Sequence, residues 1–441
     1  MSLFSSSSFR GGVHPHDQKK FTAHKAVEKC PVPDRVIIPV QQHIGAPSKP
    51  IVEKGDIVAI GDPLSEANGF VSIPVHASIS GTVKSVAKFS HPLGQSLLAV
   101  EIEGDGEERW RNDIAFDENY MELDIDEMRK RIQNAGIAGM GGATFPTHVK
   151  ISPPADKPID TLIINGVECE PYLTSDHRLM LEEPEKIIAG MKILAKILNV
   201  KNVYIGIENN KKDAIRLFRK LADGFKTIDL HVKYPQGAEK QLIKAIVSRE
   251  VPSGGLPMDV GCVVQNVGTA AAVFDAVAWK KPLIERIVTV TGKGIKEPKN
   301  LLVRIGTTYD VLFNVCGGVD EKLGKLIMGG PMMGLAQASL DLPVMKGTSG
   351  LLLFTEKEGE RKKENTCISC ARCVDACPMN LLPKMLVAFV QNNRFDDAEA
   401  YNILDCIECG SCSFLCPAQI NLVHWIRYGK NEVIKKRKKA V

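Results

Sequence analysis

Three observations predict a multidomain chain of the mixed α/β and α+β classes. The 441 residues, of which 44% are hydrophobic, are enough to build about two to four separate cores. The residue pattern changes along the chain, from short strands with turn residues to alternating strands and helices, and then back to strands. Eight of the twelve cysteines lie in two short runs near the C-terminus.

Residues 1–115 are predicted to form an N-terminal barrel-sandwich β domain. Segments 52–64 and 75–83 contain Gly-Asp pairs suited to corners and a Ser-Gly-Thr-Val strand. They resemble the two halves of a lipoyl or biotinyl carrier domain, in which a lysine on the intervening hairpin is acylated. The corresponding segment here, 66–72, has no lysine. We therefore expect this lipoyl-like domain to be a structural or docking module.

Residues 120–282 are predicted to form an α/β domain. The helical pattern is clearest at Pro184, a proline suited to a first helical turn that is followed by apolar residues at helical spacing. The predicted strands are 161–164 and 203–207, and the predicted helices are 184–198, 212–221 and 239–247. Such alternation is typical of helices packed on a sheet.

Residues 283–356 return to β character and predict a compact β-grasp (SLBB-like) domain. Its expected elements are strands 287–291 and 301–304 and a short helix, 308–313. A lysine-rich stretch, 357–363, separates it from residues 364–428, for which we predict helices 381–391 and 395–404. Residues 429–441 form a basic tail that either contacts an anionic membrane surface or is a frayed end.

The cysteine runs carry the strongest chemical signal. The first run is Cys367, Cys370, Cys373 and Cys377, the second is Cys406, Cys409, Cys412 and Cys416, and a proline follows each. This is the spacing of bacterial ferredoxins, in which three thiolates hold one [4Fe–4S] cluster and the fourth cysteine reaches the other. The predicted ligand sets are Cys367, Cys370, Cys373 and Cys416, and Cys406, Cys409, Cys412 and Cys377.

Structural zinc is the alternative, but zinc sites pair two separated C-x₂-C hooks and have no use for the trailing proline. The runs therefore predict two [4Fe–4S] clusters in an α-helical ferredoxin domain at residues 364–428, and a protein that transfers electrons.

Composition and charge exclude several other classes. The remaining cysteines have no disulfide-like spacing, which together with the cluster thiolates favours a reducing cytoplasm. The N-terminus lacks the basic and apolar regions of a secretory signal, and no stretch of about 18 apolar residues runs without a charge. A net charge of +4 is too small to indicate nucleic-acid binding.

A glycine-rich loop at 135–150 is the second chemical signal. Glycines let backbone N–H groups approach a phosphate, and Lys150 could add a positive charge. The loop differs from the dinucleotide fingerprint, because Thr144 replaces the last glycine and a helix-like stretch precedes it. Polar residues 165–178 follow the predicted strand 161–164, at the usual ligand position of α/β sheets. The alternatives are a simple turn and a solvated acidic loop.

Taken together, these motifs resemble the C subunit of the Rnf complex, a membrane complex that exchanges electrons between NADH and ferredoxin and couples this to ion translocation. The segments that carry the resemblance are 139–150, 165–178, 268–277, 329–334 and the cysteine runs. The middle region is also similar to the NADH-binding FMN subunit of respiratory complex I. Relative to that subunit, three acidic positions are neutral here, at Val167, Ala238 and Gly268.

The resemblance implies an NADH-facing electron-input subunit that uses FMN and two [4Fe–4S] clusters. It assigns the FMN phosphate to the loop amides of Gly139, Gly141 and Gly142 and to Lys150. It assigns the flavin or ribityl chain to Asn165, Asn266 and Thr269, and it places Phe145 near the nicotinamide. The orientation of NADH is assigned to Glu168, Glu170 and Glu239. We expect Glu168 to lie at the rim of the ligand cleft, with little packing against the core.

The implied partners are the other Rnf subunits, namely the ferredoxin-like B subunit and the membrane A, D, E and G subunits, with ferredoxin reached indirectly. The implied location is peripheral, on the cytoplasmic side of the bacterial inner membrane. Two other interpretations stay open: a flavin-free iron–sulfur relay and docking scaffold of the same kind of complex, and an assembly platform whose clusters are structural.

Overall fold

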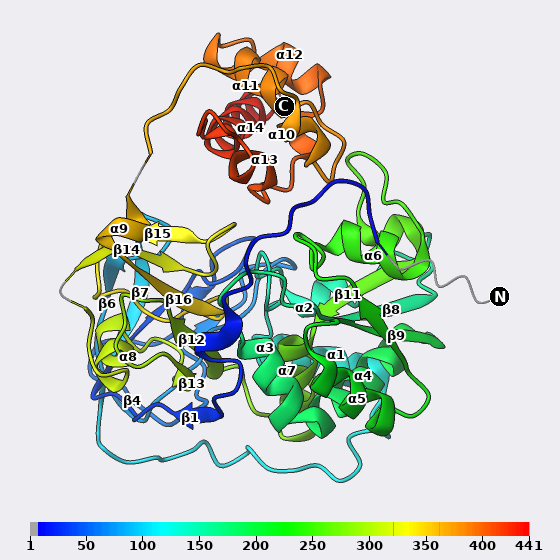
Figure 1. Ribbon diagram of the computed structural model, residues 1–441. Helices are drawn as coiled ribbons and strands as arrows, with labels where there is room; N and C mark the ends of the chain where they lie inside the picture. The colour runs from blue at the N-terminus through cyan, green and yellow to red at the C-terminus, as the bar shows by residue number, and fades with distance from the viewer. Residues whose placement is uncertain (1–7, 321, 361, 441) are drawn as a thin grey trace.

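The computed structural model describes residues 8–320, 322–360 and 362–440. A barrel-sandwich β domain, an α/β domain, a β-grasp-like domain and a helical C-terminal domain follow one another along the chain. In Figure 1 the C-terminal domain lies at the top, above the junction between the α/β domain on the right and the β domains on the left. The predicted fold class is confirmed.

The α/β domain is built on a four-stranded sheet of order β10-β9-β8-β11, in which all neighbours are parallel. Its strands are Ile- and Val-rich, as is typical of parallel sheets that helices cover on both faces. The strands are β8 Thr161–Gly166, β9 Asn202–Glu208, β10 Lys226–Leu230 and β11 Cys262–Asn266.

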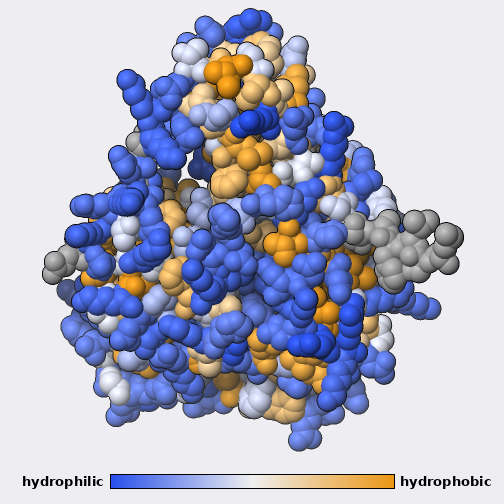
Figure 2. All heavy atoms as spheres, in the orientation of Figure 1, coloured by the Kyte–Doolittle hydropathy of each residue, from blue (hydrophilic) through white to orange (hydrophobic). Residues whose placement is uncertain are grey.

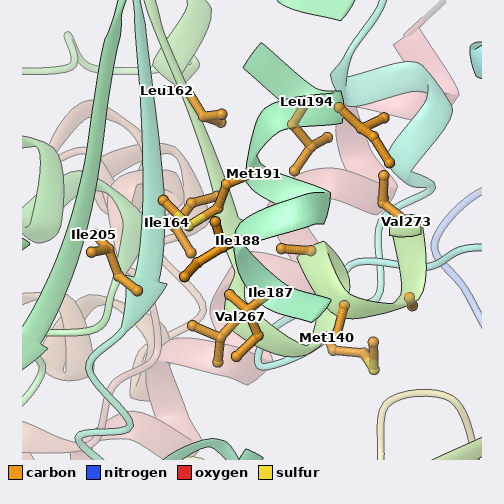
Figure 3. Packing of buried hydrophobic residues seen from close by; sticks show 14 of the residues in the cluster. Met140, Leu162, Ile164, Ile187, Ile188, Met191, Leu194, Ile205, Val267 and Val273 are labelled. Atoms are coloured by element: carbon orange, nitrogen blue, oxygen red, sulfur yellow. The ribbon is translucent and has the colours of Figure 1, made fainter. Parts of the chain in front are cut away.

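The helices of this domain include all three that the sequence predicts. They are α1 Ile125–Asn134, α2 Thr147–Lys150, α3 Ser175–Glu182, α4 Pro184–Leu198, α5 Lys212–Leu221, α6 Glu239–Val247 and α7 Val267–Ala278, with a 3-10 turn at Pro257–Val260. Figure 3 shows Ile188 and Met191 of α4 directed toward Ile164 of β8, and Ile187 beside Val267 of α7. Gly190 lets α4 approach α7 closely, since a Cβ there would lie 1.8 Å from the Ala270 carbonyl oxygen.

The barrel-sandwich domain contains a sheet of order β2-β7-β6-β4 and a separate β3-β5 pair. Its strands are β2 Arg35–Pro39, β3 Lys49–Pro50, β4 Ile57–Val58, β5 Ser65–Glu66, β6 Gly81–Ser90 and β7 Ser96–Gly104. An apolar core with Val36, Ile38 and Val100 fills it.

Part of the segment predicted as that domain, 1–115, lies outside its sheets. Residues Val27–Lys29 form strand β1, which joins the sheet of the β-grasp-like domain, and Lys19–Phe21 form a short 3-10 helix. Before them the chain passes beneath the C-terminal domain (Figure 1), where the Gly12 N–H donates to the Ala376 carbonyl and Val13 exchanges backbone hydrogen bonds with Tyr234. A strand pattern does not show which sheet a strand will join, because only long-range pairing decides that.

The β-grasp-like domain contains a six-stranded sheet of order β1-β13-β12-β16-β14-β15. Its elements are β12 Glu285–Thr291, β13 Lys299–Arg304, α8 Tyr309–Val315, β14 Leu323–Met328, β15 Leu335–Gln337, β16 Gly350–Thr355 and α9 Glu356–Gly359. Helix α8 buries Leu312 and Phe313 in the core of this domain.

The C-terminal domain is helical, as predicted. Its elements are α10 Arg372–Asp375, α11 Pro383–Gln391, α12 Phe395–Ala400, a 3-10 turn at Ile403–Asp405, α13 Ser411–Phe414 and α14 Leu422–Ala440. Within the described ranges, no helix combines the length and apolar composition needed to cross a bilayer.

The predicted boundary between residues 428 and 429 is wrong, because α14 continues through it to Ala440. Val433 of this helix is buried in the domain core. Lys436 forms an ion pair with Asp396, and Arg437 forms one with Glu399. Residues after 429 therefore belong to the folded domain and are not a frayed end.

A buried lysine joins three of the domains. Lys346 of the β-grasp-like domain is 1% exposed, and its Nζ donates to the carbonyls of Pro74 at 2.9 Å and Gly136 at 2.7 Å. Pro74 belongs to the barrel-sandwich domain and Gly136 to the α/β domain. Burial lowers the pKa of Lys346 to about 7 from an ordinary value of 10.5.

This depressed pKa predicts a specific pH dependence. Between pH 7 and 10.5 the unfolded chain binds the Lys346 proton and the folded chain does not, so the stability contributed by this residue rises with pH in that window. Lys346→Met leaves both carbonyls without a donor and should destabilise the chain at each pH, by about 1–2 kcal/mol more at pH 9 than at pH 7. Urea unfolding at the two pH values tests this, with exposed Lys322→Met as control. A pH-independent difference would contradict it.

Candidate functional site

The candidate site lies at the carboxyl edge of the parallel sheet, where ligands of such sheets bind. Strand β8 ends there at Gly166, and β11 ends at Asn266. The glycine loop 139–145 reaches this edge, because the Met140 N–H donates to Thr269 Oγ1 at 2.9 Å. The structure thus brings the predicted loop and the predicted residues at the start of α7 together.

The tip of the loop is open and needs glycine. Gly141 has φ +75°, and a Cβ there would lie 2.6 Å from Asn266 Nδ2, whereas a Cβ at Gly142 would meet nothing within 4 Å. Both residues are exposed. Backbone N–H groups without neighbouring side chains can approach an anion directly, which is the property expected of a phosphate cradle.

Several buried polar atoms near this edge have no hydrogen-bond partner among the described residues. They are Thr147 Oγ1, both amide atoms of Gln236, and Gln265 Nε2. Leaving a buried polar group unpaired costs about 1–3 kcal/mol, so a ligand with many polar atoms would stabilise this edge. FMN, with a phosphate, ribityl hydroxyls and ring carbonyls, fits that set. Sequence analysis gave neither glutamine a role in the site.

Two helices begin at the same edge, α6 at Glu239 and α7 at Val267. Helix N-termini carry positive partial charge and favour phosphate. Asn266 caps α7, since its Oδ1 accepts from the Gly268 N–H at 2.7 Å and its Nδ2 donates to Asp176 at 2.6 Å. Burial raises the pKa of Asp176 to about 6. Hydrogen bonds to both amide atoms therefore fix the side chain of Asn266, a predicted flavin ligand.

A cavity of about 90 Å³ adjoins Asp176 between the α/β and β-grasp-like domains. Its lining includes Met140, Asn266 and the buried Arg286. Burial lowers the pKa of Arg286 to about 10, and the nearby Asp176 opposes that shift. The charged residues of this cavity are a second group that sequence analysis did not identify.

Lys150 and Glu239, predicted for phosphate and NADH respectively, are partners in one ion pair. Lys150 Nζ lies 2.5 Å from Glu239 Oε1 and donates to the Val264 carbonyl at 2.7 Å. Both side chains are partly exposed, at 26% and 35%. Asn165 lies close by in the fold, since its Nδ2 donates to the Gly237 carbonyl at 2.9 Å. The half-buried Phe145 ends the glycine loop.

Glu168 is not at the cleft rim, so that expectation is wrong. Its side chain is only 4% exposed, and its carboxylate accepts from the N–H groups of Asp176 at 2.7 Å and His177 at 3.3 Å. These are the first free N–H groups of α3, so Glu168 caps that helix. Its backbone, at φ +47°, adopts the left-handed conformation and turns the carboxylate toward the helix.

Glu170 lies at the junction of three domains. It accepts from the N–H groups of Met332 at 3.1 Å and Met333 at 2.8 Å, and the Tyr234 hydroxyl lies 3.5 Å away. A Cβ at Gly330 would come within 2.2 Å of the Glu170 carboxylate, which explains the glycine at that position. Burial raises the pKa of Glu170 to about 7.

A lysine that sequence analysis missed holds these two glutamates. Lys19 Nζ donates to the carbonyls of Glu168 at 2.9 Å, Glu170 at 3.1 Å and Leu173 at 2.5 Å, and lies 3.8 Å from the Glu168 carboxylate. Burial lowers the pKa of Lys19. Nothing in its local sequence indicates this role, because its partners are about 150 residues away along the chain.

The two cysteine runs lie close together in the fold. A cavity of about 20 Å³ is lined by Cys377 of the first run together with Cys406, Cys409 and Cys412 of the second. Burial raises the pKa of Cys373, and the nearby Cys416 and Cys367 also raise it. Among the described residues, no group of three or more His, Cys, Asp or Glu side chains is arranged to hold a single metal ion.

Two cysteines of the second run are buried, whereas the first two cysteines of the first run are exposed. Cys409 and Cys412 are each 7% exposed, whereas Cys367 and Cys370 are exposed. The Tyr234 hydroxyl donates to the Cys409 carbonyl at 2.8 Å. A Cβ at Gly410 would lie 2.8 Å from the Met332 carbonyl, so the second run also contacts the β-grasp-like domain closely.

The position of Glu168 predicts a structural effect of its loss. Glu168→Gln removes the anion beside the buried Lys19 and weakens the cap of α3, so the free energy of unfolding should fall by about 1–3 kcal/mol. Glu239→Gln removes a partly exposed ion pair and should change it by less than about 1 kcal/mol. Urea unfolding of the two variants measures the contrast, and equal effects would contradict the capping role.

Comparison with known families divides the chain in the same way. Four family models match: the RnfC barrel sandwich hybrid domain at residues 7–107, the Nuo51 FMN-binding domain at 132–275, the SLBB domain at 287–336, and a 4Fe-4S dicluster domain at 366–420. The predicted kinds of domain are therefore confirmed, including an FMN-binding fold over the glycine loop and the β11–α7 turn.

The fold is shared with the NAD⁺-reducing [NiFe]-hydrogenase in the H₂-reduced state, at a TM-score of 0.50 and 17% identity over 71% of this chain. The match covers 61% of the hydrogenase chain. At this identity the similarity is one of fold alone.

Curated relatives match this chain over nearly its whole length, among them three C subunits of oxidoreductase complexes. The one from the proton-translocating ferredoxin:NAD(+) oxidoreductase complex of Clostridium ljungdahlii is 53% identical over 96% of this chain and 94% of its own. The one from the Na(+)-translocating ferredoxin:NAD(+) oxidoreductase complex of Acetobacterium woodii is 47% identical over 98% of each chain. The one from the ion-translocating oxidoreductase complex of Rhodobacter capsulatus is 41% identical over 97% and 83%. This chain therefore belongs to the RnfC family, the C subunits of the ion-translocating ferredoxin:NAD(+) oxidoreductase complexes.

Proposed function

We propose that this chain is the NADH-facing electron-input subunit of a membrane-bound, ion-translocating NADH:ferredoxin oxidoreductase, with FMN and two [4Fe–4S] clusters. The observation that carries the proposal is the direct link between the crevice and the second cysteine run. Tyr234, which lies in the segment leading to Gly237 and α6, donates to the Cys409 carbonyl at 2.8 Å. The two predicted cofactor regions are thus joined through one side chain.

When bound, FMN supplies the exchange between the electron pair of a hydride and the single electrons that a cluster accepts. The chain's own residues position it. The amides of Gly139, Gly141 and Gly142 and the N-termini of α6 and α7 would hold the phosphate, with Lys150 giving up part of its ion pair. Asn165, Gln236, Gln265 and Thr269 would bond the flavin and ribityl chain.

The predicted acidic residues take different roles in this proposal. Glu239 is the acid whose carboxylate is exposed at the crevice, so it is the candidate to contact NADH. Glu168 positions α3, and Glu170 fixes the junction with the second cysteine run. Phe145, at the end of the loop, keeps its proposed place near the nicotinamide.

The two clusters have an order in this proposal. The cluster of the Cys406 run lies toward the crevice, and the cluster that includes Cys367 and Cys370 lies toward solvent. The buried cysteines of the Cys406 run would hold the cluster that accepts electrons from FMN when NADH is oxidised, and the exposed Cys367 and Cys370 would hold the cluster that passes them on. Figure 2 shows apolar residues gathered over the C-terminal domain on this face. Exposed Ile368, Phe414 and Leu415 of that domain suit a protein partner.

The partners we propose are the ferredoxin-like B subunit and the membrane A, D, E and G subunits of the complex, with ferredoxin reached indirectly. The relatives are named as subunits of such complexes, which supports partners of this kind. We place the chain peripherally on the cytoplasmic side of the membrane, where NADH is available.

The flavin proposal is tested by replacing two glycines that have similar positive φ angles. Anaerobically prepared wild-type chain should contain stoichiometric FMN and reduce an artificial acceptor with NADH. Gly141→Ala should lose most of the FMN, because φ is +75° and the new Cβ meets Asn266. Gly106→Ala, with φ +76° and nothing within 4 Å of its Cβ, should keep it. Both variants should retain iron and acid-labile sulfide.

The outcomes separate the competing functions. Wild-type chain with clusters and no FMN would support the flavin-free relay, an alternative favoured by the hydrogen bonds that already engage Thr269 and Asn266. Cluster potentials outside any physiological couple would support structural clusters on an assembly platform.

Crossed ligation is tested by replacing two cysteines of the second run that are assigned to different clusters. Cys416→Ala should damage the cluster held by Cys367, Cys370 and Cys373, because Cys416 is the neighbour of Cys373. Cys412→Ala should damage the other cluster, whose cavity it lines with Cys377. Electron paramagnetic resonance of the dithionite-reduced variants distinguishes the two. Loss of the same cluster in both variants would show that each run holds its own cluster.

A further inference from the structure

An exposed aromatic residue occupies the loop where a carrier domain would have its acylated lysine. Phe70 lies in segment 66–72 of the barrel-sandwich domain and is 63% exposed, more than any other Phe, Tyr or Trp side chain that the structure describes. A single exposed apolar residue is ordinary on a protein surface. The contacts of Phe70 are unusual, because they are made mainly with a residue of another domain.

The Phe70 carbonyl accepts a hydrogen bond from His148 Nε2 at 2.9 Å, and the Phe70 ring packs edge-on against the His148 ring with centroids 5.9 Å apart. His148 is 4% exposed, and burial lowers its pKa, so the imidazole is neutral and donates through Nε2. Within the loop, Ser72 Oγ accepts from the Asn68 N–H at 3.0 Å and donates to the Ala46 carbonyl at 2.9 Å. Both the backbone and the ring of Phe70 are therefore fixed relative to the α/β domain.

His148 belongs to α2, which follows directly on the glycine loop 139–145. A second attachment lies a few residues further along the barrel-sandwich chain, where Pro74 and Gly136 share the Lys346 ammonium. Gly347, next to Lys346, packs against Thr144 of the loop. The barrel-sandwich loop and the glycine loop are thus held on one support, and Phe70 is attached just beyond the end of the glycine loop.

We propose that Phe70 stacks on the adenine ring of the dinucleotide substrate, so that the barrel-sandwich domain completes a binding site whose reactive part lies on the α/β domain. This rests on the proposed oxidation of NADH at the crevice. The nicotinamide has to lie against the flavin, and the two riboses and the pyrophosphate carry the adenine away from it. A planar apolar face that is held rigidly at the margin of the crevice suits that second ring.

The inference is tested on the full-length chain loaded with its cofactors, using NADH and reduced nicotinamide mononucleotide, which has no adenine. Phe70→Ala should raise the KM for NADH by about tenfold, within the range that stacking on one base provides, and leave kcat nearly unchanged. It should not change kcat/KM for the mononucleotide, FMN content or iron content. Phe70→Trp should restore the KM for NADH. Ile57→Ala, at a 73% exposed position in the same domain, is the matched control and should behave as wild type.

Each other result overturns a defined part of the inference. If Phe70→Ala changes the kinetics of both substrates equally, or of neither, Phe70 does not recognise adenine even though NADH is oxidised. If NADH kinetics stay normal while the variant loses its attachment to the other subunits of the complex, Phe70 belongs to a protein interface. If wild-type chain containing FMN oxidises neither substrate, the proposed function itself fails.

Discussion

Two buried lysine side chains hold together segments that lie far apart in the sequence, and the candidate site depends on both. Lys19 binds three carbonyls of segment 168–173, and Lys346 binds carbonyls of the barrel-sandwich and α/β domains. Each ammonium is buried, and burial lowers the pKa of each. A buried amino group is tolerated only where its donors are used, so movement of either partner segment would leave an unpaired polar group in the interior.

This constraint fixes the geometry that electron transfer needs. Segment 168–173 carries Glu170, which binds the loop at Met332 and Met333 and approaches Tyr234, and Tyr234 binds Cys409. Successive polar contacts thus link Lys19 to the second cysteine run. Hydrogen bonds and solvent exposure around a cluster set its reduction potential. The same contacts that dock the C-terminal domain therefore tune the cluster proposed to receive the first electron.

The acidic residues show how position divides the work among similar side chains. Glu168, Glu170 and Glu239 have the same chemistry, but they cap a helix, join three domains and face the crevice, respectively. Burial raises the pKa of Glu170 to about 7, whereas Glu168 meets two helix N–H groups and a lysine. Their functions follow from what surrounds each carboxylate and not from its distance along the chain from the glycine loop.

The sequence by itself determined the kinds of domain, the two cysteine runs of the 4Fe-4S dicluster domain and helix 184–198, because each follows from local spacing: three to four residues per helical turn, or cysteines at fixed intervals before proline. It also located the glycine loop, since only glycine fits at Gly141. Tertiary structure alone decided that β1 joins a distant sheet, that α14 continues through the basic tail, that Glu168 is buried, that Lys19 binds segment 168–173, and that Phe70 contacts His148. Those features depend on contacts between residues that are far apart in the chain, and such contacts leave no local pattern in the sequence.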